Sequence, residues 1–207
     1  MKDAKKAALR AGLSLTVFGV VLGATAQAQA APRTHDGFYL QLDIGLGYLS
    51  TSAESGGATV KYSGVTIPSA LWLGGTVGNL VIGGGFFTDY APSPSASLNG
   101  GNSIELTDVS MYLIGLGIFA DYYLDPHGGL HFQPFLGWGG LETSYQGNAG
   151  GSDPTGLVLA IGGGYDWWLG EQWSVGVLGR FAYAPLKLNE VGYSTIAPAL
   201  LATFTYH

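Results

Sequence analysis

About eight segments of this chain, between Phe38 and His207, carry an apolar residue at every second position. Successive side chains of a strand point to opposite faces of a sheet, so a period of two separates two environments. One face is suited to lipid or to a core, and the other tolerates charge and glycine. In the first segment the two faces read Phe38, Leu40, Leu42, Ile44, Leu46, Tyr48 and Tyr39, Gln41, Asp43, Gly45, Gly47, Leu49.

The connections between these segments alternate in length. Short turns are predicted at Gly78-Asn79, at residues 125–129 and at residues 170–172, where Gly, Asn and Pro favour tight reversals. Longer polar loops are predicted at residues 50–66, 91–106, 143–155 and 185–193. Short turns on one side and long loops on the other are typical of outer-membrane barrels, with the short side in the periplasm.

The fold class that follows is all-β, an eight-stranded antiparallel up-and-down transmembrane β-barrel. The first and last strands are expected to pair, because lipid cannot solvate an open sheet edge. Pro134 and Pro198 remove backbone donors within predicted strands and are expected to mark bulges. The strands are predicted at residues 37–49, 67–78, 80–90, 107–124, 130–142, 156–169, 173–184 and 194–206.

Residues 1–30 have the organisation of a cleavable signal peptide. A positive start with Lys2 and Arg10 precedes an apolar run at residues 11–22 and the small-x-small sequence Ala28-Gln29-Ala30. An N-terminal membrane helix is disfavoured, because the run is shorter than the ~20 residues that span a bilayer. The domain organisation is therefore a signal peptide at residues 1–30 and one outer-membrane β-barrel domain at residues 31–207.

The charge and the absence of cysteine exclude several classes of function. Without the signal peptide, 4 Lys and Arg face 13 Asp and Glu, giving a net charge of -9 against -6 for the whole chain. An acidic protein with scattered basic residues is not expected to bind nucleic acid. The chain has no cysteine, so it has neither a disulfide framework nor a thiol nucleophile. No cofactor is expected.

Aromatic residues are predicted to form two girdles at the membrane surfaces. The girdle on the periplasmic side contains Phe38, Tyr122, Trp167, Trp173 and Tyr206, and the outer girdle contains Tyr48, Tyr112, Trp138 and Tyr183.

The signal peptide, the opening Asp36-Gly37-Phe38-Tyr39-Leu40, the glycine-rich segment at residues 161–166 and the aromatic residues near the chain end resemble the small eight-stranded outer-membrane β-barrels of the OmpA/OmpX type. The resemblance covers residues 31–207 as architecture. It implies a location in the outer membrane of a Gram-negative cell envelope, contact with outer-membrane lipid and lipopolysaccharide, and recognition by the barrel-assembly machinery during insertion. Members of the family usually end on an aromatic residue, whereas here His207 follows Phe204 and Tyr206.

A charge network is predicted inside the barrel, formed by Asp43, Asp121, Asp166 and Arg180, with Asp89 and Glu142 nearer the loops. An unpaired charge in a narrow barrel costs several kcal/mol, so Arg180 is expected to contact Asp43 or Asp166. A structural role is favoured over an ion relay or a gate, because an eight-stranded interior is just wide enough to be filled by side chains.

No enzymatic activity is expected. The histidines His35, His127, His131 and His207 lie near the termini or a periplasmic turn, away from the long loops, and are predicted to be polar rim residues. The adjacent same-face position to His131 is Gln133, which has no hydroxyl group to serve as a nucleophile. No metal site is predicted, although a weak periplasmic one stays open. The glycine runs at residues 83–85 and 162–164 lack the Lys-Ser/Thr of a phosphate loop and are expected to leave room for packing.

The leading functional hypothesis is a non-enzymatic outer-membrane β-barrel with a structural or surface-interaction role through long polar extracellular loops. The loop partner is unknown. One alternative is a narrow channel or carrier for a small or apolar solute. Another is a soluble exported barrel of the lipocalin kind with its apolar face inward, which would leave the two aromatic girdles unexplained.

Overall fold

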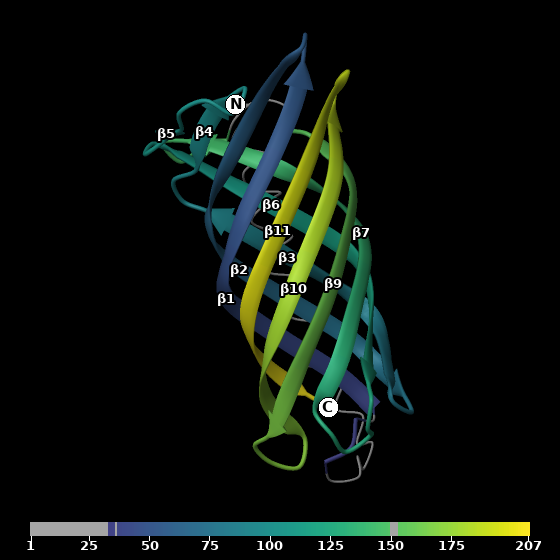
Figure 1. Cartoon of the computed structure of the whole chain (residues 1–207). Helices are drawn as coiled ribbons and strands as arrows, with labels where there is room; N and C mark the ends of the chain where they lie inside the picture. Colours follow the sequence, from purple (N-terminus) through teal and green to yellow (C-terminus); the bar gives the residue numbers. More distant parts are fainter. Residues whose placement is uncertain (1–32, 36, 150–152) are drawn as a thin grey trace, which may run out of the picture.

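The computed structural model describes residues 33–35, 37–149 and 153–207, and the predicted signal peptide lies outside the described residues. Eight long strands form a closed antiparallel barrel (Figure 1). Strand β1 pairs with β2 on one side and with β11 on the other, so the barrel has no open edge. The predicted fold class and the pairing of the first and last strands are confirmed. The strands are β1 (Gly37–Ser55), β2 (Ala58–Val77), β3 (Leu80–Ala91), β6 (Val109–Tyr123), β7 (Leu130–Tyr145), β9 (Thr155–Trp168), β10 (Trp173–Leu188) and β11 (Val191–Tyr206).

The outward face of the barrel is apolar. Ile44 and Leu116 are 61% and 66% exposed, whereas the inward-facing Tyr39 and Leu49 are fully buried. A continuous exposed apolar surface of this kind is suited to lipid. The interpretation as a soluble barrel of the lipocalin kind is wrong, because it requires the opposite orientation of the two faces. Among the described residues, no helix is long and apolar enough to cross a bilayer.

The three predicted short turns are confirmed, and they lie at one end of the barrel. They connect β2 to β3, β6 to β7 and β9 to β10. The start of β1 and the end of β11 lie at the same end, as Figure 1 shows for the C-terminus. This end is called the turn end below, and the opposite end is called the loop end.

Two of the four predicted long loops are instead continuations of strands. Residues 50–66 extend β1 and β2 to a tight turn at Gly56-Gly57, with φ values of 58° and 81°. Residues 185–193 extend β10 and β11 to a turn that contains Asn189, with φ 52°. Outside a membrane a strand needs no apolar face, so the alternation ends while the ladder continues. The overlooked signal is the Gly-Gly pair, which favours a two-residue hairpin turn.

The other two predicted loops contain short strands. Strand β4 (Ser95–Leu98) pairs with the loop-end half of β2, and β5 (Ile104–Glu105) pairs with β4. Strand β8 (Asn148–Ala149) folds back on the end of β7. In Figure 1, β4 and β5 lie beside the barrel at its loop end.

The prediction of bulges at Pro134 and Pro198 is wrong. The ladder between β6 and β7 has a gap beside Pro134, yet the same register continues on both sides of the gap. The ladder between β1 and β11 has a similar gap beside Pro198. Proline lacks the N–H that such a pair requires, so pairing is lost locally without the insertion of a residue.

Candidate functional site

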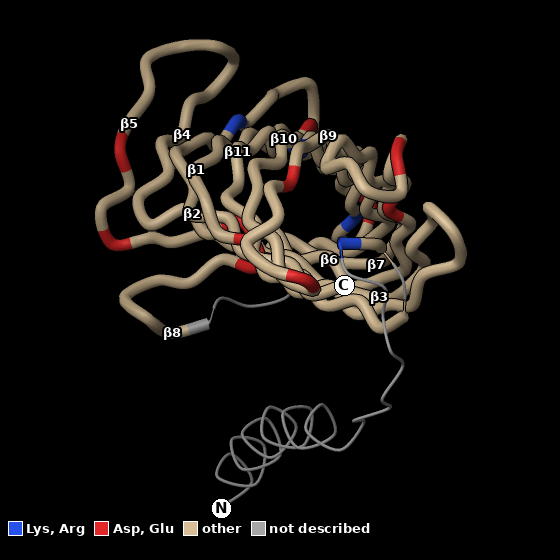
Figure 2. Tube along the Cα trace, turned by 90° about the horizontal axis from the view of Figure 1, so that it is seen from below, with Lys and Arg blue, Asp and Glu red and all other residues tan. Residues whose placement is uncertain are grey.

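Inward-facing side chains fill the lumen. Four aromatic rings pack in the middle, with Trp72 5.1 Å from Phe119 and 5.5 Å from Phe135, and with Phe87 5.4 Å from Phe135. All four of these residues are buried. Figure 2 views the barrel along its length, and acidic and basic residues are visible within its outline. The candidate site is therefore a packed interior of mixed aromatic and polar side chains.

Arg180 does not pair with Asp43 or Asp166, so this prediction is wrong. Its Nη2 donates to Asp89 Oδ1 at 2.6 Å, and both side chains are almost completely buried. The guanidinium also lies 4.1 Å from the centre of the Phe87 ring. Asp89 is on β3 and Arg180 is on β10, so this ion pair crosses the lumen. Glu142, expected inside near the loops, is exposed.

Asp43 and Asp166 have neutral donors instead of a cation. The indole N–H of Trp72 and the amide of Gln41 each donate to Asp43 at 2.7 Å. Tyr123 donates to Asp166 at 2.9 Å, and Thr203 donates to it at 3.0 Å. These hydrogen bonds satisfy both carboxylates without Arg180.

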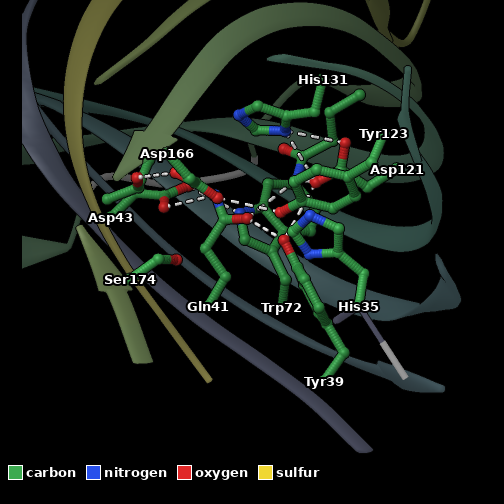
Figure 3. A network of polar contacts seen from close by, with 12 residues as sticks. His35, Tyr39, Gln41, Asp43, Trp72, Asp121, Tyr123, His131, Asp166 and Ser174 are labelled. Carbon is green, nitrogen blue, oxygen red and sulfur yellow. Dashed lines mark hydrogen bonds and ion pairs between the residues drawn. The ribbon is translucent and has the colours of Figure 1, made fainter. Parts of the chain in front are cut away.

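Asp121 is the centre of a third group of contacts (Figure 3). His131 Nδ1 lies 2.8 Å from Asp121 Oδ1, and Tyr39 donates to Asp121 Oδ2 at 2.9 Å. Tyr39 also contacts Gln41, which joins this group to Asp43. Three of the four residues of the predicted charge network therefore belong to hydrogen-bonded groups near the turn end, while Arg180 forms a separate pair with Asp89.

The prediction that all four histidines are polar rim residues is wrong for three of them. His35, His131 and His207 are buried, and among the four only His127 is exposed. His35 stacks on Tyr123 with ring centres 3.5 Å apart, and Tyr123 also stacks on His131. His131 is buried because it is the inward-facing neighbour of Leu130 and Phe132 on β7. His35 and His207 lie in the segments that flank β1 and β11 and turn into the mouth of the barrel, which alternation along a strand does not predict.

A serine lies beside this histidine group, which sequence reasoning did not anticipate. Ser174 Oγ is 2.9 Å from His207 Nε2, His207 Nδ1 is 3.0 Å from His35 Nδ1, and His35 Nε2 donates to the Gly128 carbonyl at 2.8 Å. A hydroxyl, a base and an orienting group at such distances are the elements of nucleophilic catalysis. Ser174 is completely buried, however, so its hydroxyl is closed to a substrate in this conformation. The arrangement holds chain segments together.

Burial determines the charge state of the two terminal histidines. Desolvation lowers the pKa of His35 to about 4, against the opposing effects of the Gly128 carbonyl and of Asp121. Desolvation and the neighbouring His35 lower the pKa of His207 to about 2. Both rings are therefore neutral at neutral pH.

Glycine provides room for the inward side chains at two positions. A methyl group on Gly85 would overlap the Trp72 ring, and one on Gly176 would overlap the Asp166 carboxylate. The expectation that inward glycines leave space for packing is confirmed at these positions.

The predicted girdle residues face outward or lie at the edge of the outward face. Tyr112 and Tyr206 are half-buried, and the other seven are exposed. Phe38 and Tyr48 are separated by ten residues of β1, or ~33 Å along a strand. At the usual tilt of ~40° this distance matches an apolar band of ~25 Å. The membrane-boundary role of these nine residues stays a prediction, and it implies that the hairpins beyond Tyr48 project from the membrane.

The loop end contains a cavity of about 380 Å³. Its lining is mainly apolar and includes Tyr62, Met111, Leu141, Leu188 and Tyr193. Within the part of the chain that the structure describes, no group of three or more histidine, aspartate or glutamate residues is arranged to hold a metal ion.

The chain is similar to known proteins in its fold alone. No protein-family model matches the chain, and no curated protein sequence matches it. Neisserial surface protein A is 18% identical with a TM-score of 0.52, over 82% of this chain and 96% of that protein. OprG from Pseudomonas aeruginosa is 11% identical with a TM-score of 0.49, over 85% and 99% of the two chains. Ail from Yersinia pestis is 13% identical with a TM-score of 0.47, over 83% and 99%. With its closed sheet and apolar outward face, the chain has the fold of the small eight-stranded outer-membrane β-barrels and is suited to the outer membrane of a Gram-negative cell envelope.

Proposed function

We propose that the protein is a closed, non-enzymatic outer-membrane barrel that acts at the cell surface through its projecting hairpins. The observation that supports this proposal is the filled lumen. Its aromatic layer and the Arg180–Asp89 pair cross the interior between the turn end and the loop end. A packed eight-stranded interior leaves no continuous path for ions.

The surfaces available for recognition are at the loop end. The β1–β2 and β10–β11 hairpins extend furthest there (Figure 1). Beyond the level of Tyr48 the β1–β2 hairpin is rich in Ser, Thr and Gly, and the charged residues of the two hairpins include Glu54, Lys61 and Lys187. The strands of both hairpins stay paired up to their turns, which gives the side chains a defined register and favours contact with a partner over mere shielding of the barrel.

The outward face and the end of β11 are the parts of the barrel proposed to contact the membrane and the assembly machinery. Outer-membrane lipid and lipopolysaccharide would contact the outward apolar face, and the barrel-assembly machinery would recognise the end of β11 through Phe204 and Tyr206. Both residues continue the outward alternation, and Phe204 is exposed. The loop partner is left open.

Planar-bilayer conductance of the refolded barrel tests whether the lumen is closed. The wild-type protein should give no discrete current steps. A variant with both Trp72→Ala and Phe135→Ala is the positive control, because it removes two of the packed rings and should produce steps. Reproducible steps from the wild-type protein would overturn the proposal.

Shortened hairpins test the surface role. Ser52 pairs with Lys61, and Pro185 pairs with Ser194, so the residues between each pair can be replaced by Asn-Gly while the register is kept. Cells that express the doubly shortened barrel should lose attachment to surfaces while their outer membrane keeps its resistance to detergent. Heat-modifiable gel migration confirms folding. Unchanged attachment would favour a purely structural role and contradict the proposal.

The cavity at the loop end favours a second candidate function, binding of a small apolar solute. Its volume lies within the range of small-molecule sites. The filled lumen below would block axial passage, so binding is favoured over conduction. Titration with the fluorescent probe 1-N-phenylnaphthylamine tests this candidate in detergent-free vesicles. Met111→Glu should weaken the saturable part of the signal, and Ile104→Glu, on the exposed β5 ribbon, should leave it unchanged. No saturable signal would exclude this function.

A further inference from the structure

We propose that His35 and His207 form an acid-released latch that closes the turn end of the barrel. His35 precedes β1, and His207 follows β11, so neither side chain belongs to a barrel strand. Both rings nevertheless lie inside the mouth, where they are 2% and 1% exposed. Figure 3 shows His35 against the ring of Tyr123.

The contacts join parts of the chain that are far apart in sequence. His35 reaches the Gly128 carbonyl in the β6–β7 turn and the ring of Tyr123 on β6. His207 reaches Ser174 at the start of β10. The two histidines also meet each other and lie 5.0 Å and 4.7 Å from the Trp168 ring on β9. The latch therefore connects both barrel-closing strands to the opposite wall.

Neutral rings can make these hydrogen bonds with only one distribution of protons. The Gly128 carbonyl accepts, so His35 must carry its proton on Nε2. His35 Nδ1 is then an acceptor, and His207 must donate to it from Nδ1. His207 Nε2 is in turn an acceptor, and Ser174 must donate its hydroxyl proton to it. This result makes His207 the Nδ1–H tautomer and His35 the Nε2–H tautomer.

Acid disrupts this arrangement through two successive protonations. One added proton can be accommodated on His35, if the His207 proton moves to Nε2 and Ser174 becomes the acceptor. The resulting charge is buried between aromatic rings, which disfavours it. A second proton would place an N–H on both Nδ1 atoms that face each other, and their hydrogen bond would be lost. Two positive rings would then repel at contact distance.

The surroundings offer little compensation for such a charge. The titratable groups that face the pair are Tyr39 on β1, Asp121 and Tyr123 on β6, His127 in the β6–β7 turn and His131 on β7. Asp166 on β9 lies against Tyr123. Asp121, whose charge favours protonation of His35, already contacts His131 and Tyr39. The other histidines add repulsion when protonated.

The direction of the pH dependence follows from the lowered pKa values of the latched rings. The ordinary pKa of histidine is 6.5, whereas burial lowers the pKa of the latched His35 to about 4. At pH above 6.5 both states are neutral, and the latch has its full stability. As the pH falls below 6.5 the released state takes up protons first, so release is favoured by up to about tenfold per histidine for each pH unit.

Release can occur without unfolding of the barrel. The β1–β2 ladder starts at Gly37, after His35, and the β10–β11 ladder ends at Tyr206, before His207. The backbone N–H of Arg33 donates to the Glu171 carbonyl, and the backbone N–H of His207 donates to the Gln172 carbonyl. Release would open the turn end towards Asp121 and His131, while Arg180 and Asp89 keep the lumen closed. Evidence against the latch would therefore leave the proposal of a closed barrel untouched.

Nitrogen-15 NMR of histidine-labelled protein in lipid nanodiscs tests the proton distribution. His35→Gln and His207→Gln variants assign the signals. At pH 7.5 His207 should be the Nδ1–H tautomer and His35 the Nε2–H tautomer, and neither should titrate near 6.5. Rings that titrate near 6.5, or a His207 ring in the Nε2–H form, would overturn the latch.

Spin labelling tests release itself. The chain has no cysteine, so Arg33→Cys provides a single site for a nitroxide. The label should be immobile at pH 7.5 and become mobile as the pH falls from 6.5 to 4, while circular dichroism shows an intact barrel. His127→Gln, which removes the exposed histidine, should leave the transition unchanged. The double variant His35→Gln and His207→Gln should abolish the transition. No transition in the wild-type protein, or the same transition in the double variant, would contradict the proposal.

Discussion

The ion pair between Arg180 and Asp89 provides the sharpest test of how the lumen is held together. The two side chains are 2% and 0% exposed, and the donor and acceptor are 2.6 Å apart. Removing one partner leaves the other as an unpaired buried charge, which typically costs about 3–5 kcal/mol. Arg180→Met and Asp89→Leu should therefore each lower the free energy of unfolding by about this amount.

The double variant should behave differently from the sum of its parts. Replacing both partners by apolar side chains removes both desolvation penalties, so the pair itself contributes little net stability. The contact of Arg180 with Phe87 is also lost, which typically costs about 0.5–2 kcal/mol. We therefore expect the double variant to be destabilised by about 1–2 kcal/mol, with a large coupling energy between the two sites.

Urea-induced unfolding in phospholipid vesicles, followed by tryptophan fluorescence, measures these free energies. Lys187→Leu is the matched control, because Lys187 is an exposed cation on the same strand as Arg180. Its replacement should leave the unfolding midpoint unchanged. Additive effects in the double variant, or an Arg180→Met barrel as stable as the Lys187→Leu barrel, would refute the reasoning.

Three further substitutions examine the outward face, the inward glycines and the hydrogen-bond network. Ile44→Arg should lower the free energy of unfolding in vesicles by about 2–4 kcal/mol, because it places a charge against lipid. The same change at Ile104 of β5, which is also exposed, should have no effect, and equal costs at the two positions would argue against the membrane boundary. Gly85→Leu forces a side chain into the Trp72 ring and should cost about 1–3 kcal/mol or prevent folding, seen as loss of heat-modifiable migration. Tyr123→Phe removes a donor to Asp166 and should cost about 1–3 kcal/mol in the urea titration, and a smaller cost would mean that water replaces the hydroxyl.

The inward and outward faces could be predicted from the sequence because they are encoded locally. Each strand alternates with a period of two, and this alternation distinguishes Ile44 from Asp43 without knowledge of any neighbour. The predicted hairpin turns were confirmed for a similar reason, because Gly78-Asn79 and the other turn residues act within a few positions. The strand extensions at residues 50–66 were missed because polar strands outside a membrane lack the alternation, although Gly56-Gly57 carries a turn signal.

The sequence alone thus determined the closed eight-stranded barrel, its apolar outward face and the inward position of Asp43, Asp121, Asp166 and Arg180. Only the tertiary structure decided which of those residues meet. Asp89 and Arg180 are 91 positions apart, and their contact depends on the relative positions of strands across the barrel. Asp43 and Asp166 could not be excluded as partners until their neutral donors were visible. The burial of His35 and His207 likewise depends on two segments that leave the strand pattern and turn into the mouth, and a local periodicity contains no information about where such segments go.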